Sequence, residues 1–293
     1  MASSASISVI AVVCVTCILF YGIYLDTEVV VFVAASKSSP LDPEMKALLE
    51  TKWWSSAETN NSSSPGECYG ISCTAGGRVT KINLAKSYLE GKLKLKFSSF
   101  PNLYFVDLHG NGLQGSIPSD IGTLSNLTVL DLSFNQLTGE IPLSIVNLTQ
   151  LLIFDIASNN IHGFIPLEIG NMESLNLLYL SLNKIIGSIP TGIGNLKNLM
   201  RLHLKSNNLI GPVPTTLAGC SYLQELILSH NYLTGCFSHR FVDLYWLNTN
   251  LSHNFFSGEI PGKLGGSGHL SILYLSYNNL TGNIPLSHFY TRC

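Results

Sequence analysis

The chain has 293 residues, of which 46% are hydrophobic and only 12% are charged, and its formal net charge is −2. The apolar fraction is ample for a buried core. The near-neutral charge excludes a general nucleic-acid binder, which needs a basic excess to neutralise phosphates. Length and composition leave two ordinary domains or one repeat array as alternatives, so the residue pattern has to decide between them.

Residues 1–35 have the pattern of a targeting segment. The nineteen residues from Ile7 to Leu25 include no charged side chain, and Val33-Ala34-Ala35 resembles a signal-peptidase site. This pattern predicts that the mature chain begins at Ser36. A run of this length can also span a bilayer, so an uncleaved membrane anchor is the alternative. Both alternatives predict the secretory pathway, and the membrane would be contacted only through an uncleaved anchor.

Cysteines and glycosylation sequons agree with that route. The cysteines after the leader are Cys68, Cys73, Cys220, Cys236 and Cys293, an odd number that leaves at least one thiol unpaired within a monomer. Cys220 is predicted to be a buried free thiol, which behaves as a small apolar residue. Sequons for N-glycosylation begin at Asn60, Asn61, Asn126, Asn147, Asn250 and Asn279.

A short helix is predicted within residues 41–55, which read LDPEMKALLETKWWS. Asp42 can cap the first turn, and Pro43 suits the first helical position, where no backbone N–H is needed. A Ser/Asn-rich loop follows and leads to the sequences CYGISC and GGRVTKINL.

Residues 79–293 are organised by an internal repeat of about 24 residues. Asparagines recur at Asn111, Asn135, Asn159, Asn183, Asn207, Asn231, Asn254 and Asn278. Each is followed two positions later by Leu, Ile or Phe and four positions later by Gly. In all but one unit, a Pro stands three residues after this Gly. A looser unit over residues 79–102 precedes them. The chain is therefore expected to be a solenoid of about nine repeats.

The repeat pattern has a direct physical interpretation. In one unit, LTVLDLSFNQLTGEIPLSIVNLTQ, alternating leucines of a short strand point inward while the residues between them point outward. One unit cannot bury its leucines alone, but stacked units bury them against one another and align their strands in a parallel sheet. The recurring Asn is expected to bond backbone groups of adjacent units.

These motifs carry a family resemblance. The L-x-G-x-I-P signature, as in Leu113–Pro118 and Leu137–Pro142, resembles the plant extracellular leucine-rich repeat of receptor-like kinases, receptor-like proteins and polygalacturonase-inhibiting proteins. The resemblance covers about 250 residues. It implies an α/β repeat solenoid: a right-handed superhelix with a parallel concave sheet, short second strands, helical or 3-10 return segments and an N-terminal helical cap.

The resemblance also implies a cap over residues 36–78, in which Cys68 and Cys73 form a disulfide. The family's usual spacing between these cysteines is longer than the four residues found here. Two units depart from the pattern. The seventh lacks Ile-Pro after Gly235 and loses one residue, with Thr249 at a Leu position. It is interpreted as a drifted repeat, with a functional bend or contact surface as the alternative. The last ends without the family's C-terminal Cys pair, so a truncated ectodomain is expected.

The expected recognition residues lie at the outward positions of the concave sheet. Asp107, Asp131 and Asp155 recur at one strand position and predict an acidic stripe, with an ordinary solvated face as the alternative. Arg201, His203 and Lys205 form a basic ladder expected to face solvent, with His203 titrating near the ordinary imidazole value of about 6.5. Ordinary surface variation is the alternative to a binding role for this ladder. Glu225 and Tyr274 are further candidates. Peptide-binding members of the family often hold a ligand carboxylate with an Arg-x-Arg pair. In this chain Arg201 matches the first Arg of that motif, and His203 replaces the second.

The sequence predicts a binding module rather than an enzyme. It has no kinase Gly-rich loop, His-Arg-Asp or Asp-Phe-Gly motif, and no convergent set of titratable residues. We expect no cofactor, no metal and no nucleic-acid partner. The expected function is recognition of a peptide ligand or a protein co-receptor at the plant cell surface or in the apoplast. The alternative is an inhibitor of a secreted polysaccharide-degrading enzyme of the cell wall.

Overall fold

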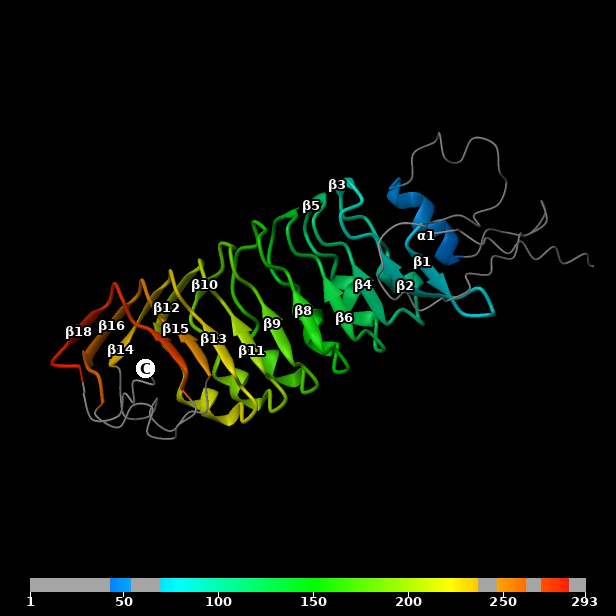
Figure 1. The fold of residues 1–293 in the computed structure, drawn as a ribbon. Helices are drawn as coiled ribbons and strands as arrows, with labels where there is room; N and C mark the ends of the chain where they lie inside the picture. Colours follow the sequence, from blue (N-terminus) through cyan, green and yellow to red (C-terminus); the bar gives the residue numbers. More distant parts are fainter. Residues whose placement is uncertain (1–42, 54–68, 237–246, 262–269, 285–293) are drawn as a thin grey trace, which may run out of the picture.

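The computed structural model describes residues 43–53, 69–236, 247–261 and 270–284. They form an elongated stack of coils whose short strands line up side by side (Figure 1). Ten strands make one long sheet: β1 (Ile71–Cys73), β2 (Val79–Asn83), β4 (Phe105–Asp107), β6 (Val129–Asp131), β8 (Ile153–Asp155), β9 (Leu177–Tyr179), β11 (Arg201–His203), β13 (Glu225–Ile227), β15 (Asn248–Asn250) and β17 (Ile272–Tyr274). Apart from the antiparallel β1–β2 pair the sheet is parallel, as the repeat predicts.

Short second strands run beside this sheet. They are β3 (Glu90–Lys92), β5 (Gly112–Gly115) and β7 (Gln136–Leu137) in one sheet, and β10 (Ile186–Gly187), β12 (Asn208–Pro212), β14 (Tyr232–Cys236), β16 (Phe255–Glu259) and β18 (Asn279–Thr281) in another. Isolated bridges Glu140–His162 and Phe164–Ile186 lie between the two sheets. The predicted second strands are therefore confirmed.

The return segments are 3-10 turns: η1 (Phe97–Ser99), η2 (Ser119–Thr123), η3 (Leu143–Asn147), η4 (Leu167–Asn171), η5 (Thr191–Asn195) and η6 (Thr215–Gly219). A proline directly precedes each turn from η2 to η6, and Pro142 is representative, with φ −65° and ψ 135°. The pyrrolidine ring fixes this φ, so the direction of the return path is set locally. Gly139 has φ 80° in the turn before it, a conformation that disfavours side chains.

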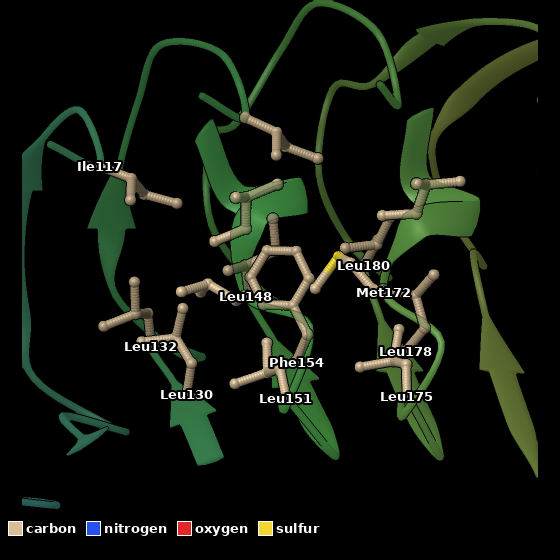
Figure 2. Close-up of a cluster of buried hydrophobic side chains, with 14 of the residues drawn as sticks. Ile117, Leu130, Leu132, Leu148, Leu151, Phe154, Met172, Leu175, Leu178 and Leu180 are labelled. Atoms are coloured by element: carbon tan, nitrogen blue, oxygen red, sulfur yellow. The ribbon is translucent and has the colours of Figure 1, made fainter. Parts of the chain in front are cut away.

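The core runs the length of the stack, as its central part in Figure 2 shows. Leu130, Phe154 and Leu178, the middle residues of β6, β8 and β9, are fully buried. Leu148 and Met172 from the return segments are equally buried against them. Each such side chain contributes roughly 1.5–3 kcal/mol by leaving water, so the repeated leucines hold neighbouring coils together.

The recurring asparagines form the expected ladder. Asn159 donates through Nδ2 to the carbonyl oxygens of Leu132 in the preceding coil (3.0 Å) and Ile156 in its own (3.1 Å). Its Oδ1 accepts the backbone N–H of Leu137 at 2.9 Å. Asn183 and Asn207 repeat this arrangement, and all three are buried. The ladder satisfies backbone groups that burial would otherwise leave unpaired.

The N-terminal helix is confirmed as α1 (Pro43–Thr51), which begins at the proline expected in its first turn. Glu44 of this helix is buried, and its Oε2 accepts the backbone N–H of Val79 at the start of β2, at 2.8 Å. Oε1 lies 4.0 Å from the guanidinium of Arg78. Glu44 thereby attaches the helix to the first coil. Asp42, Cys68 and residues 1–35 lie outside the described residues. The capping of the helix by Asp42, the Cys68–Cys73 disulfide and the targeting segment therefore remain predictions.

The shortened seventh unit keeps its place in the stack. Thr249 pairs with Leu226 across β15 and β13 and is buried where the other units have an apolar residue. The asparagine ladder continues through the shortened unit, because Oδ1 of Asn254 accepts the backbone N–H of Leu233 at 3.0 Å. The Oγ1 of Thr249 has no hydrogen-bond partner among the described residues. The lost residue therefore leaves the register intact, and the threonine at this apolar position leaves one buried polar atom unsatisfied.

Cys220 is a buried free thiol, as predicted, and donates to the carbonyl oxygen of Ile193 at 3.1 Å. Burial raises the pKa of this thiol to about 11, so the thiol stays protonated and unreactive. Cys236 is also unbonded but exposed. The structure therefore has no Cys220–Cys236 bridge.

The last described coil is less well covered than its neighbours. Leu273, Leu275 and Leu280 are only partly buried, whereas Leu226 and Leu228 are fully buried. Among the described residues, no helix combines the length and apolarity needed to cross a bilayer.

Candidate recognition surface

The long sheet displays two columns of outward side chains. From β2 to β17 the middle residue of each register triplet points into the core, so the residues on either side of it point outward. One column is Lys81, Phe105, Val129, Ile153, Leu177, Arg201, Glu225, Asn248 and Ile272; the other is Asn83, Asp107, Asp131, Asp155, Tyr179, His203, Ile227, Asn250 and Tyr274. We call this surface the strand face.

Three aspartates lie in register on the strand face. Asp107 on β4 is paired with Asp131 on β6, and Asp131 with Asp155 on β8. Oδ1 of Asp155 accepts the backbone N–H of Ala157 at 2.8 Å, and the other two aspartates make the equivalent bond. Burial, reinforced by the charges of Asp131 and Asp107, raises the pKa of Asp155 to about 7. The stripe therefore carries less negative charge than the sequence indicates.

Asp155 should make stability depend on pH. Its pKa is about 7 in the folded chain, against an ordinary value of 3.8, so the folded state binds the proton of Asp155 more tightly than the unfolded state does. The resulting stabilisation is fully present below pH 3.8 and is lost as pH rises through 7. We expect the unfolding free energy of the wild type, relative to Asp155→Asn, to fall by about 2 kcal/mol between pH 5 and pH 8.

Denaturant titration at both pH values measures this difference. Asparagine is the suitable replacement because its Oδ1 can still accept the Ala157 N–H while its charge is zero at both values. Glu173→Gln, which removes an exposed carboxylate, is the control and should follow the wild type. Equal pH dependence in the wild type and Asp155→Asn would contradict the role of Asp155.

A polar cluster lies where β9, β11, β13 and β15 adjoin. Oε2 of Glu225 lies 3.5 Å from Nε of Arg201 and 3.0 Å from Nε2 of His203. The Arg201 guanidinium also donates to the hydroxyl of Tyr179 at 3.4 Å, and Asn248 donates to Oε1 of Glu225 at 2.9 Å. The Tyr179 and His203 rings are 4.5 Å apart. One carboxylate thus holds both basic groups of β11.

The basic ladder predicted from the sequence is only partly a solvent-facing feature. Arg201 is 52% exposed and Lys205 is exposed, but His203 is 27% exposed and is covered by Tyr179 and Glu225. Burial lowers the pKa of His203, and Glu225 only partly opposes this effect. The expectation that His203 titrates at the ordinary imidazole value is therefore wrong, because a sequence does not show burial.

A second ring cluster lies just beyond the strands. His230 and His253 stack with centroids 4.1 Å apart, and Tyr277 stacks on His253 at the same distance. Slight burial lowers the pKa of His230, and the nearby His253 and Lys205 add to the shift. Tyr274, a sequence candidate, is exposed but lies on β17, two strands from Glu225. The structure therefore groups Arg201, His203 and Glu225, and leaves Tyr274 and the aspartates apart from them.

Sequence inspection missed Tyr179 and Asn248 as members of the polar cluster. Both could have been found by aligning the repeats, because Tyr179 occupies the strand position of Asp155 and His203, and Asn248 that of Glu225. Their contacts with Arg201 and Glu225 could not be predicted from the sequence. The register shows which residues are neighbours on adjacent strands, but it does not give the rotamers of their side chains.

The sequons differ in accessibility. Asn126, Asn147 and Asn279 are exposed, whereas Asn250 is half-buried on the strand face and its Oδ1 accepts the N–H and hydroxyl of Ser252 at 3.1 and 2.8 Å. Asn60 and Asn61 lie outside the described residues. Within the described part of the chain, no group of three or more His, Cys, Asp or Glu side chains is arranged to hold a metal ion.

Comparison with protein families agrees with the geometry. Leucine-rich-repeat models match residues 173–233 and, separately, residues 102–124, 126–148 and 269–289. The chain is a leucine-rich-repeat solenoid protein. No curated protein sequence matches it. Both family models describe repeats, so nothing in these matches indicates a kinase domain within the chain.

Among solved structures, the chain is similar to ectodomains of plant leucine-rich-repeat receptor kinases. The Arabidopsis thaliana GASSHO1/SCHENGEN3 ectodomain, in complex with CASPARIAN STRIP INTEGRITY FACTOR 2, is 38% identical over 67% of this chain and 24% of its own, with a TM-score of 0.65. The Arabidopsis HAESA ectodomain, with an extended IDA peptide hormone, is 29% identical over 84% and 43%, with a TM-score of 0.70. A plant ice-binding protein is 27% identical over 83% and 88%, with a TM-score of 0.64.

The chain spans less than half the length of the first receptor ectodomains it matches. Its repeats, sheet and turns are similar to those of the repeat arrays in these ectodomains.

Proposed function

We propose that the chain is an extracellular recognition module that binds a peptide or a protein partner on its strand face. The observation that carries the proposal is the half-exposed guanidinium of Arg201, held between Tyr179 and Glu225. An Arg fork is suited to a carboxylate, which it can bind through two parallel hydrogen bonds. The primary ligand feature is therefore an anionic group such as a peptide carboxylate.

Glu225 is central to how such a ligand would bind. Its Oε2 already lies near both Arg201 and His203, at 3.5 and 3.0 Å. A ligand carboxylate approaching Arg201 has to share or displace this internal anion, since two carboxylates side by side repel. Glu225 would thereby reject weak anions and admit a ligand with additional contacts.

Those additional contacts can come from the aliphatic column beside the cluster. Val129, Ile153 and Leu177 are half-buried outward residues on successive strands leading to Arg201. An extended peptide crossing the strands could lay apolar side chains on this column and its carboxylate on Arg201. The apolar contacts would supply affinity, and the charged end would supply direction.

The similar structures support the same class of ligand. The HAESA structure contains a peptide hormone, and another contains both that hormone and the co-receptor SERK1. We infer by similarity that this chain works at the cell surface or in the apoplast, reached through the secretory pathway, with a peptide or a protein co-receptor as its partner. Inhibition of a polysaccharide-degrading enzyme is the rival function and would use the same face.

Peptide selection tests the proposal. A pool of synthetic twelve-residue peptides with free C-terminal carboxylates, and the same pool amidated, would be passed over immobilised protein. We expect the wild type to enrich free-carboxylate peptides and Arg201→Ala to lose that preference, while Lys205→Ala retains it. Equal retention of both pools by the wild type would contradict the carboxylate site, and inhibition of a polygalacturonase would then favour the rival function.

A further inference from the structure

One column of the strand face contains an apolar stretch with a basic residue at each end. The stretch occupies four adjacent strands, β4, β6, β8 and β9, and consists of the half-buried side chains Phe105, Val129, Ile153 and Leu177. Lys81 precedes it on β2, and Arg201 follows it on β11. Beyond Arg201 the column becomes polar, with Glu225 and then Asn248. The apolar stretch therefore has a defined length, and both of its ends are cationic.

The side chain of Lys81 lies over the near end of this stretch. Its Nζ is 4.6 Å from the centroid of the Phe105 ring, a cation–π contact that directs the ammonium group from β2 toward β4. Burial raises the pKa of Asp107, and the charge of Lys81 is one of the effects that oppose this rise. Among the described residues Lys81 forms no ion pair, whereas Arg201 lies 3.5 Å from Glu225. Lys81 is thus a positioned cation that can accept an anionic group of a ligand.

The column beside the apolar stretch restricts where a ligand can carry negative charge. Asp107, Asp131 and Asp155 occupy this neighbouring column on β4, β6 and β8. An anionic side chain over the middle of the stretch would lie close to these carboxyl groups and be repelled by those that are ionised. At the two ends it would instead meet Lys81 or Arg201. The strand face therefore favours a ligand with an apolar middle and a negative group at each end.

The register of the sheet gives the separation of the two basic residues. Five steps from strand to strand lead from β2 to β11, and adjacent strands lie about 4.8 Å apart, so the two backbones are about 24 Å apart. The Lys81 ammonium group leans about one strand toward Arg201, which brings the two charges to about 20 Å. An extended peptide advances about 3.3 Å per residue. Six or seven residues therefore span the distance between Lys81 and Arg201.

We propose that the strand face binds an extended peptide through two anionic groups, its C-terminal carboxylate on Arg201 and an acidic side chain six or seven residues earlier on Lys81. This inference rests on the proposed function, because it takes the carboxylate site at Arg201 as given. Alternate side chains of the bound peptide point toward the sheet, and those between the two anions are apolar. Lys81 is then a specificity-determining residue, since it fixes the position of the second anion and with it the direction and register of the peptide.

Peptides of defined sequence test the position of the second anion. The probe is an acetylated ten-residue peptide in which valine and serine alternate and the last residue has a free carboxylate. A glutamate replaces the valine that stands either seven or three residues before the last residue. We expect glutamate at seven to strengthen binding to the wild type about fivefold relative to glutamine. Glutamate at three faces the aspartate column and should not strengthen binding. Calorimetric titration at low ionic strength measures both.

Substitutions in the protein separate contact with Lys81 from general electrostatic attraction. Lys81→Gln should abolish the fivefold advantage of glutamate at seven. Lys81→Arg keeps a cation that can lie over Phe105 and should restore most of it. Lys92→Gln is the matched control, because Lys92 is exposed on β3 and outside the strand face, and this variant should keep the full advantage. Circular dichroism and an unchanged affinity for the glutamine peptide show that each variant is folded.

The proposed function and the role of Lys81 fail by different results. Equal binding of the free-carboxylate and amidated glutamine peptides to the wild type would contradict the carboxylate site at Arg201, and the second anchor with it. A preference for the free carboxylate, combined with equal affinity for glutamate and glutamine at seven, would overturn the role of Lys81 alone. A Lys81→Gln variant that retains the full advantage of glutamate would overturn it in the same way.

Discussion

Replacement of Asn159 by alanine is expected to lower the free energy of unfolding by about 2 kcal/mol. The substitution removes the acceptor of the Leu137 N–H and the donor to the carbonyl oxygens of Leu132 and Ile156. The two carbonyl oxygens each keep a second donor, Asn135 for Leu132 and Asn183 for Ile156, so the substitution mainly affects the Leu137 N–H. This N–H lies inside the stack, where water cannot replace Asn159, and an unsatisfied group of this kind costs about 1–3 kcal/mol. Denaturant titration followed by circular dichroism measures the loss.

The adjacent Asn160 provides a matched control. It has the same side chain one position later, but it is half-buried and outside the ladder. Asn160→Ala should therefore stay within about 0.5 kcal/mol of the wild type, as surface substitutions usually do. A loss below about 1 kcal/mol for Asn159→Ala would show that the coils are held by the leucine core alone.

Replacement of Arg201 by alanine is expected to weaken binding of a selected free-carboxylate peptide by on the order of 2 kcal/mol, or about 30-fold. The guanidinium is half-exposed on the strand face, so its loss removes the charged hydrogen bonds to the ligand while leaving the core intact. The unfolding free energy should change by no more than about 0.5 kcal/mol. Calorimetric titration of the same peptide into both proteins measures the difference.

Further titrations distinguish a specific carboxylate site from general electrostatic attraction. Arg201→Lys keeps the charge but loses the planar fork, so it should recover only part of the affinity. The amidated peptide should bind the wild type and Arg201→Ala alike. Glu225→Gln removes the competing charge and should bind at least as tightly as the wild type. An unchanged affinity of Arg201→Ala for the peptide would show that Arg201 is an ordinary surface residue with no role in binding.

The architecture of the chain can be predicted from its sequence, because each repeat contains the signals for its own local structure. The leucine spacing predicts an inward-facing strand, the proline sets the return turn, and the asparagine supplies hydrogen bonds between coils. Repetition makes these signals reliable: one coil's pattern is confirmed by the next, so even the unit shortened at Thr249 keeps its register. Cys220 was predictable for the same reason, since its place in the return segment is an apolar one.

The contacts of the outward residues, in contrast, became visible only in three dimensions. Arg201 and Glu225 are 24 positions apart in sequence, and nothing in either repeat indicates that Glu225 would hold both Arg201 and His203. The pKa of Asp155, raised to about 7, depends on burial and on two aspartates from other coils. Core positions are specified by one requirement, exclusion of water, which every repeat shares. Surface properties arise from pairs of side chains across neighbouring coils and from their desolvation, and a one-dimensional pattern contains neither.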